Sequence, residues 1–286
     1  MRSLRFVCIP ACTAVLLFGQ TTLDQHLATA QKARAERQYQ IAEREGAAAV
    51  QEAEKLGPFN PRLNESLASL GLTYYVQRNY KQAEPLLFRA TEVGEAIGVE
   101  SGTLATQLDY LGMARYFQRK NPEALATLQK ALEWREKALG PDHPDTGGLL
   151  VDLANVQAAL LNWEQAESSL RRALRIRDRL VGPDRARTAV TMMQLAEVLN
   201  SEAKYDEAET NYRNALKLRE ALFGPENASV SDSLDRLGEF LFHRGRNVEA
   251  EPLLRRSLAI SREGLRSGQH SGCDRGLQSV LGRPRP

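Results

Sequence analysis

The chain has 286 residues, a hydrophobic content of 42%, a charged content of 26% and a formal net charge of +2. This is the composition of an ordinary soluble protein and excludes a largely disordered chain. The balanced charge argues against nucleic acid as a partner, because nucleic-acid binding requires a concentrated basic excess. The three cysteines, Cys8, Cys12 and Cys273, lack zinc-site spacing and do not form an even set that would indicate a disulfide framework.

Residues 1–20 have the pattern of a secretory signal peptide. Arg2 and Arg5 precede a mostly apolar run, residues 6–18, and Gly19 follows as a small residue. A bilayer-spanning helix needs roughly 20 apolar residues, so no stable membrane span is expected. We therefore expect an exported protein, periplasmic or extracellular, that is cut near Gly19. The alternatives are an uncleaved anchor, a wrongly assigned start codon and a cytoplasmic protein.

Residues 21–56 are predicted to form a degenerate N-terminal helix pair. They are rich in Ala, Gln, Glu, Lys and Arg, which favour helices, and they contain no proline. Tyr39 and Ala42 lie 41 residues before Tyr80 and Ala83, so the segment follows the frame of the units after it.

Five clearer units occupy residues 57–265, at spacings of 41 or 42 residues, and each begins at a glycine: Gly57, Gly98, Gly140, Gly182 and Gly224. A fixed period of this length indicates stacked supersecondary units. Each unit predicts two helices, with apolar residues three and four apart on one face. The first helix of each unit has a small residue after a leucine: Gly71, Gly112, Ala154, Ala196 and Gly238. The second helix also repeats a small residue: Ala83, Ala124, Ala166, Ala208 and Ala250.

The joints between units are predicted from turn residues. Four of the five units open with Gly-Pro, which favours the end of one helix and prevents its continuation. Asn60, Asp145 and Asp184 are candidate caps or turn residues before the helices that follow. Residues 266–286 leave the frame, are rich in glycine and arginine, and are predicted to be a disordered basic tail.

The alternation of small and large apolar residues in each pair resembles the tetratricopeptide repeat. The 42-residue period, the Gly-Pro-Asp-His-Pro-Asp-Thr joint at residues 140–146 and the Ala-Glu-Pro-Leu-Leu pattern at 83–87 and 250–254 are similar to the kinesin-light-chain subtype. The resemblance implies an all-α fold, a right-handed superhelix (α-solenoid) of antiparallel helix pairs. It also implies that the first helices line a concave groove and that the groove binds a peptide or protein segment.

No catalytic or cofactor site is predicted. No nucleophile, base and orienting group occur in a recognisable constellation, and no histidine has metal-ligand spacing. We therefore expect a non-enzymatic interaction scaffold without a cofactor. The alternative is a structural array that assembles with itself and has no separate ligand.

The repeat frame also predicts which residues line the groove. These are Leu72, Tyr75, Asp109, Met113, Tyr116, Phe117, Asn155, Glu197, Asn200, Asp232, Asp235 and Glu239. No lysine or arginine falls at these positions, so we expect a ligand with apolar or aromatic residues at one end and basic residues at the other. The alternatives are that some of the aromatic residues only pack between helices, and that the basic tail occupies the groove.

Overall fold

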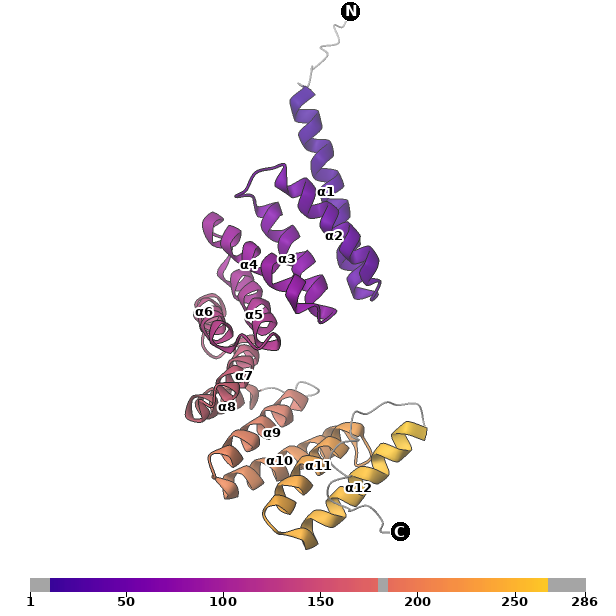
Figure 1. Cartoon of the computed structure of the whole chain (residues 1–286), viewed down its shortest axis with the longest axis vertical. Coiled ribbons are helices and arrows are strands. Elements are labelled where there is room, and N and C mark those ends of the chain that lie inside the picture. Colours follow the sequence, from indigo (N-terminus) through magenta and orange to yellow (C-terminus); the bar gives the residue numbers. More distant parts are fainter. Residues whose placement is uncertain (1–10, 180–184, 267–286) are drawn as a thin grey trace, which may run out of the picture. The chain divides into compact units, whose positions relative to one another are not determined.

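The computed structural model describes the backbone of residues 11–179 and 185–266, and the side chains of residues 22–179 and 185–263. These residues form twelve helices and no strand (Figure 1). The helices are α1 (Ala11–Ala35), α2 (Tyr39–Glu54), α3 (Pro61–Val76), α4 (Tyr80–Ile97), α5 (Ser101–Phe117), α6 (Asn121–Leu139), α7 (Pro144–Ala159), α8 (Trp163–Arg177), α9 (Arg185–Ser201), α10 (Tyr205–Phe223), α11 (Ala228–His243) and α12 (Asn247–Arg266).

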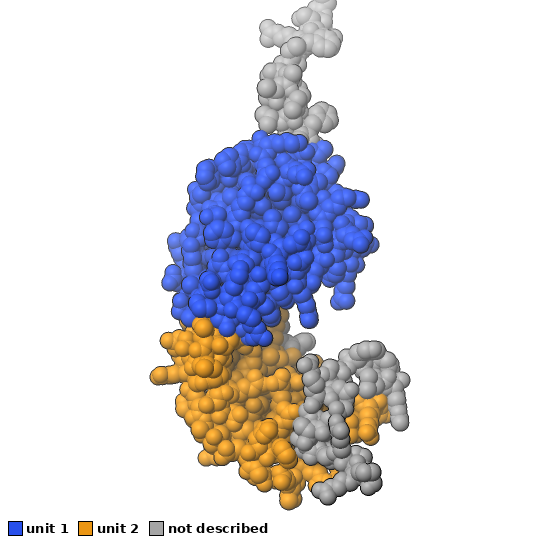
Figure 2. All heavy atoms as spheres, viewed as in Figure 1, with its two compact units in different colours: residues 1–141 blue, residues 142–286 orange. Residues whose placement is uncertain are grey.

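The helices belong to two compact units, residues 1–141 with α1–α6 and residues 142–286 with α7–α12 (Figure 2). In unit 1 each helix packs against the next one in the chain, and α3 also contacts α1 and α5. In unit 2 the helices from α7 to α12 likewise pack in sequence order. Each unit is therefore a stack of helix pairs in which the odd-numbered helix comes first.

The turn inside every helix pair has the same backbone conformation. One residue of each turn has a left-handed φ between 60° and 76°: Arg37, Arg78, Arg119, Leu161, Ala203 and Gly245. The residue after it donates its N–H to a carbonyl near the end of the first helix, as Asn162 does to Gln157 over 2.9 Å. Helices commonly end in this way, although glycine is the usual residue at the left-handed position. Five of the six pairs hold a residue there for which the conformation is strained.

The joints between pairs use the glycines that the sequence analysis identified. Gly57, Gly98, Gly140 and Gly224 have positive φ, and Gly182 lies outside the described residues. The Asn60 side chain accepts a hydrogen bond from the Arg62 N–H over 2.8 Å, which confirms that cap.

One predicted cap is wrong. Asp145 does not cap α7, because it already lies in the first turn of that helix. His143 is the cap, and its Nδ1 accepts from the Asp145 N–H over 3.2 Å. The proline that follows His143 starts the helix two residues earlier than a cap at Asp145 predicts. Asp184, the other candidate, lies outside the described residues.

The cores of the helix pairs depend on the small residues predicted from the repeat. Leu87, Leu128 and Leu254 on second helices are fully buried, and each lies against a first-helix glycine. A methyl group added at Gly112 would lie 2.6 Å from Leu128, closer than side chains approach in folded proteins. The small residues therefore set the distance between the two helices of a pair.

The predicted signal peptide and tail fall mostly on residues that the structure does not describe. Residues 1–10 and the tail beyond Arg266 lie outside the described part, and α1 starts at Ala11 and crosses the predicted cleavage position. Within the described residues, none of the helices has both the length and the apolar character that crossing a bilayer requires.

Candidate functional site

The predicted groove residues all lie on first helices, as the repeat frame requires. Those of unit 1 lie on α3 and α5, and those of unit 2 on α7, α9 and α11. We describe the two groups separately.

In unit 1 five aromatic rings form one connected cluster. Tyr75 meets Tyr80 and Tyr110 edge to face, with ring centroids 5.5 and 5.1 Å apart. Tyr80 stacks on Phe117 at 4.6 Å, and Tyr116 lies 5.5 Å from Phe117. The sequence analysis named three of these rings and missed Tyr80 and Tyr110. Phe117 is 46% exposed, so the cluster both packs between helices and presents an aromatic surface.

Two other predicted groove residues of unit 1 have internal roles. Met113 is only 8% exposed and belongs to the core. Asp109 lies 3.7 Å from the guanidinium of Arg135, a buried residue of α6. The charge of Asp109 is therefore largely balanced within the unit.

In unit 2 a cavity of about 220 Å³ lies between α7, α8 and α9. Ala154, Asn155 and Ala158 line it from α7, and Trp163 closes it from the start of α8. On α9 the lining residues include Gln194, Glu197 and Ser201. Asn155 and Glu197 are predicted groove residues, and the structure brings them to the same cavity.

The polar chemistry of this cavity is that of two amides. The Gln194 Nε2 donates to the Asn155 Oδ1 over 2.9 Å. The Gln194 Oε1 is buried and accepts no hydrogen bond from the described residues. Once Gln194 and Asn155 are bonded to each other, one amide NH2 group and one amide oxygen remain to bind a ligand, and this also holds if both amides are turned together. A buried acceptor without a partner is costly, which makes it a place where a donor would bind.

The four predicted carboxylates of unit 2 are not all available to a ligand. Arg236 of α11 forms an ion pair with Glu197 and another with Asp232, the latter over 3.3 Å. The buried Arg219 of α10 also binds Asp232, over 2.8 Å. Arginines outside the predicted positions thus reach these acids, so part of the acidic charge predicted for unit 2 is balanced within the unit.

The last two carboxylates lie further along α11. Asp235 and Glu239 are half-buried. Burial, with a contribution from the nearby charge of Glu239, raises the pKa of Tyr212 to about 12. Asn200, the remaining predicted residue of this unit, is exposed near the end of α9.

Sequence reasoning missed Gln194, Trp163 and Arg236. A signal existed for the first two: Gln194 directly precedes the Leu195-Ala196 pair, and Trp163 opens its second helix where Tyr80 and Tyr205 open theirs. Arg236 has the same place in its own repeat, directly before Leu237-Gly238, but its pairing with Glu197, 39 residues away in the chain, could not be predicted.

Comparison with known sequences identifies the family. The tetratricopeptide repeat pattern matches residues 102–179, 145–204 and 187–263, which together cover more than half of the chain. The chain belongs to the tetratricopeptide repeat family. A comparison with curated protein sequences gives no match.

Solved structures of tetratricopeptide proteins share the fold. Kinesin-light-chain TPR-like repeats from Podospora anserina superpose with a TM-score of 0.63 at 19% identity, over 70% of this chain and 95% of that one. BtubC (BKLC) from P. vanneervenii gives 0.64 at 19% identity, over 92% and 99%. PilF of Pseudomonas aeruginosa gives 0.56 at 16% identity, over 88% and 95%.

The predicted fold class is therefore confirmed as an all-α tetratricopeptide solenoid with kinesin-light-chain-like repeats. Tetratricopeptide repeats are typically non-catalytic scaffolds that bind other proteins, because stacked helix pairs present extended surfaces.

Proposed function

We propose that this tetratricopeptide protein binds an extended peptide segment of a partner protein on the first-helix side, with Asn155 and Gln194 as the main polar contact. The observation that carries the proposal is the amide pair in the α7–α9 cavity. An extended main chain offers N–H donors and C=O acceptors, and the pair offers one acceptor and one donor group. Ala154 and Ala158 leave room for the ligand backbone beside it.

The side-chain preference of the ligand follows from the surroundings. In unit 2 Glu239 supports a basic residue in the ligand, whereas Glu197 and Asp232 already bind arginines. In unit 1, as a contact of that unit alone, the exposed Phe117 supports binding of an apolar side chain, since aromatic residues often carry binding energy.

The test is selection of binders from a random-peptide display library, followed by affinity measurement on variants. Asn155→Leu with Gln194→Met removes the amides at nearly constant volume. We expect about tenfold weaker binding or more, from two lost hydrogen bonds of about 1 kcal/mol each. Gln165→Met, at an exposed position of α8, is the matched control and should bind as the parent does. Unchanged affinity in the double variant would reject the amide pair as the binding site.

We also infer that this binding takes place outside the cytoplasm. The basic and apolar pattern of residues 1–20 supports export. The intact mass of the protein from its native fraction tests this, since a chain that still begins at Met1 would reject cleavage near Gly19.

A further inference from the structure

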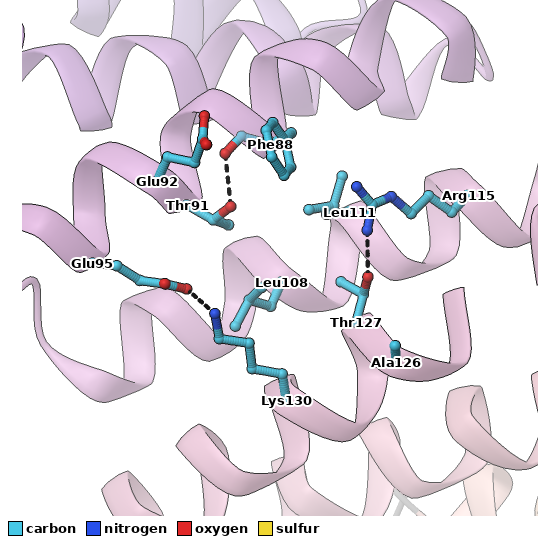
Figure 3. A pocket seen from close by; sticks show the side chains of 10 residues that line it. All are labelled: Phe88, Thr91, Glu92, Glu95, Leu108, Leu111, Arg115, Ala126, Thr127 and Lys130. Carbon is cyan, nitrogen blue, oxygen red and sulfur yellow. Dashed lines mark hydrogen bonds and ion pairs between the residues drawn. The ribbon is translucent and has the colours of Figure 1, made fainter. Parts of the chain in front are cut away.

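A second cavity, of about 370 Å³, lies in unit 1 between α4, α5 and α6 (Figure 3). We call it the α4–α6 cavity. Its α4 and α6 residues belong to second helices, and it contains none of the predicted groove residues of α5, such as Asp109 and Tyr116. It is therefore separate from the proposed peptide site.

The lining of the α4–α6 cavity suits an apolar side chain. Leu108 and Leu111 of α5 are buried at its base, and Phe88 of α4 is 43% exposed at its edge. The two hydroxyls in the lining are satisfied internally. Thr91 donates to the Phe88 carbonyl over 2.7 Å, and Thr127 binds the Arg115 guanidinium over 2.6 Å (Figure 3).

Among the charged residues that line the cavity, one acidic residue has no ion-pair partner among the described residues. Lys130 pairs with Glu95 over 2.5 Å, and Arg115 pairs with Glu84 over 3.3 Å. Glu92, on the exposed side of α4, has no ion-pair partner among the described residues. A ligand would therefore gain most by placing a cation beside Glu92.

The other repeats show that this cavity is not a requirement of the fold. Thr91 occupies a position that is leucine in the four later units: Leu132, Leu174, Leu216 and Leu258. These leucines are half-buried, so a leucine at position 91 would fill much of the space that threonine leaves empty. The cavity thus results from one departure from the repeat.

Phe88 is a second departure at the same place. Its position holds Arg171, Arg213 and Arg255 in the last three units, and each of these arginines forms ion pairs. Arg171 and Arg213 reach Glu207 and Glu249 of the next repeat. At position 88 an exposed aromatic ring replaces this charge. A large exposed apolar group beside a cavity is typical of a contact surface.

We propose that the α4–α6 cavity is a second docking site, for a partner protein segment that inserts one leucine-sized or phenylalanine-sized side chain against Phe88 and Leu111 and places a lysine or arginine beside Glu92. The cavity supplies the apolar contact, and the unbalanced carboxylate supplies the charge preference. The site is independent of the amide pair in unit 2.

Two substitutions test the site by installing residues that other repeats already carry. Thr91→Leu fills the cavity, and Phe88→Arg restores the repeat arginine. Both should fold, which circular dichroism and a melting curve check. The probe is a random-peptide display library selected against the full-length parent. We expect a class of peptides with a large apolar residue near a basic residue, whose affinity falls roughly tenfold or more in both variants.

Further variants distinguish this site from the proposed peptide site. Asn155→Leu with Gln194→Met should leave this class of peptides bound, and Glu92→Lys should weaken it. Thr103→Leu, at an exposed position of α5, is the control and should change nothing. The proposal is overturned if no selected peptide loses affinity in Thr91→Leu and Phe88→Arg. It is also overturned if the affected peptides lack basic residues. A dimer of the parent that Thr91→Leu dissociates would identify a second copy as the occupant instead.

Discussion

Gly112→Ala tests whether the small residues set the helix spacing. The added methyl group would lie 2.6 Å from two carbons of Leu128 and 3.5 Å from the Ala124 carbonyl oxygen. Leu128 is fully buried, so it has little room to change rotamer. Either α5 and α6 must separate, or Leu128 must adopt a strained side-chain conformation.

Two opposing effects set the expected magnitude. Overpacking of a core costs about 1–3 kcal/mol. Replacing glycine by alanine in a helix interior returns about 1 kcal/mol of helix propensity. The 2.6 Å approach to the fully buried Leu128 puts the overpacking cost at the upper end of its range, about 2–3 kcal/mol, so we expect Gly112→Ala to lower the free energy of unfolding of unit 1 by about 1–2 kcal/mol. The loss should be similar at Gly238 and smaller at Gly71, where the closest approaches are 2.7 and 2.9 Å.

Urea denaturation followed by tryptophan fluorescence measures the effect. Trp134 lies in unit 1 and Trp163 in unit 2, so a Trp163→Phe background isolates unit 1. The matched control is Gly148→Ala in α7, where an added methyl group meets no atom within 4 Å. Followed through Trp163, this control should stabilise unit 2.

A double-mutant cycle separates the contact from general damage. Leu128→Ala should cost about 2–5 kcal/mol alone, because it leaves a cavity. Adding Gly112→Ala to it should cost nothing further, since the methyl group then has space. Additive losses, or a Gly112→Ala protein as stable as the parent, would refute the role assigned to the small residue.

Three further predictions follow from single residues. Burial, opposed by the charge of Arg177, raises the pKa of Asp152 to about 6. Ionisation of Asp152 therefore lowers the stability as the pH rises from the ordinary aspartate pKa, about 4, to about 6, so Asp152→Asn should stabilise unit 2 by about 2 kcal/mol at pH 7.5 but not at pH 3.5, as urea midpoints at the two pH values would show. Leu161→Gly should raise the stability of unit 2 by about 1 kcal/mol, because Leu161 has a left-handed φ of 61° and is 69% exposed, whereas Leu160→Gly in the same assay should not. Burial opposes the charge of Glu167, but hydrogen bonds from Lys204 and Arg171 lower its pKa to about 2. Glu167→Gln should therefore cost about 1 kcal/mol of stability at pH 7. The parent should lose this contribution as the pH falls from 4.5 to 2, and the variant should lose less stability over the same range.

The fold was predictable because its determinants recur locally. The position of Gly112 follows from the same five-fold pattern that places Leu128 on the second helix, and the structure brings the two into contact. The left-handed conformation of the turn residues inside the helix pairs was not predictable. Arg78 and Leu161 carry no signal for it, since the neighbouring helices impose that conformation.

The groove could be predicted only in part. The repeat frame placed Asn155 and Glu197 on first helices, and the structure brings both to one cavity. The repeat frame did not predict the charge around these residues, because an arginine side chain is long enough to reach an acid of the neighbouring repeat. Arg236 stands beside an inward position rather than at one, yet it binds both Glu197 and Asp232. The set of inward positions therefore predicted two side chains that share a cavity, but not the charge around them.

The copies within one repeat protein provide an internal reference for function. Positions needed for stacking should hold similar residues in every copy, as the position of Gly71 and Gly112 does with a small residue in each unit. A departure in one copy that leaves a space in the packing, or that exposes an apolar ring, does not serve the stacking of the helix pairs. Thr91 and Phe88 depart together, are three residues apart on α4, and line the same cavity. Thr91 leaves a space and Phe88 exposes an apolar ring, and each departure should reduce stability slightly. Two such departures at one place are expected where contact with a partner, rather than the fold, determines which residues occur.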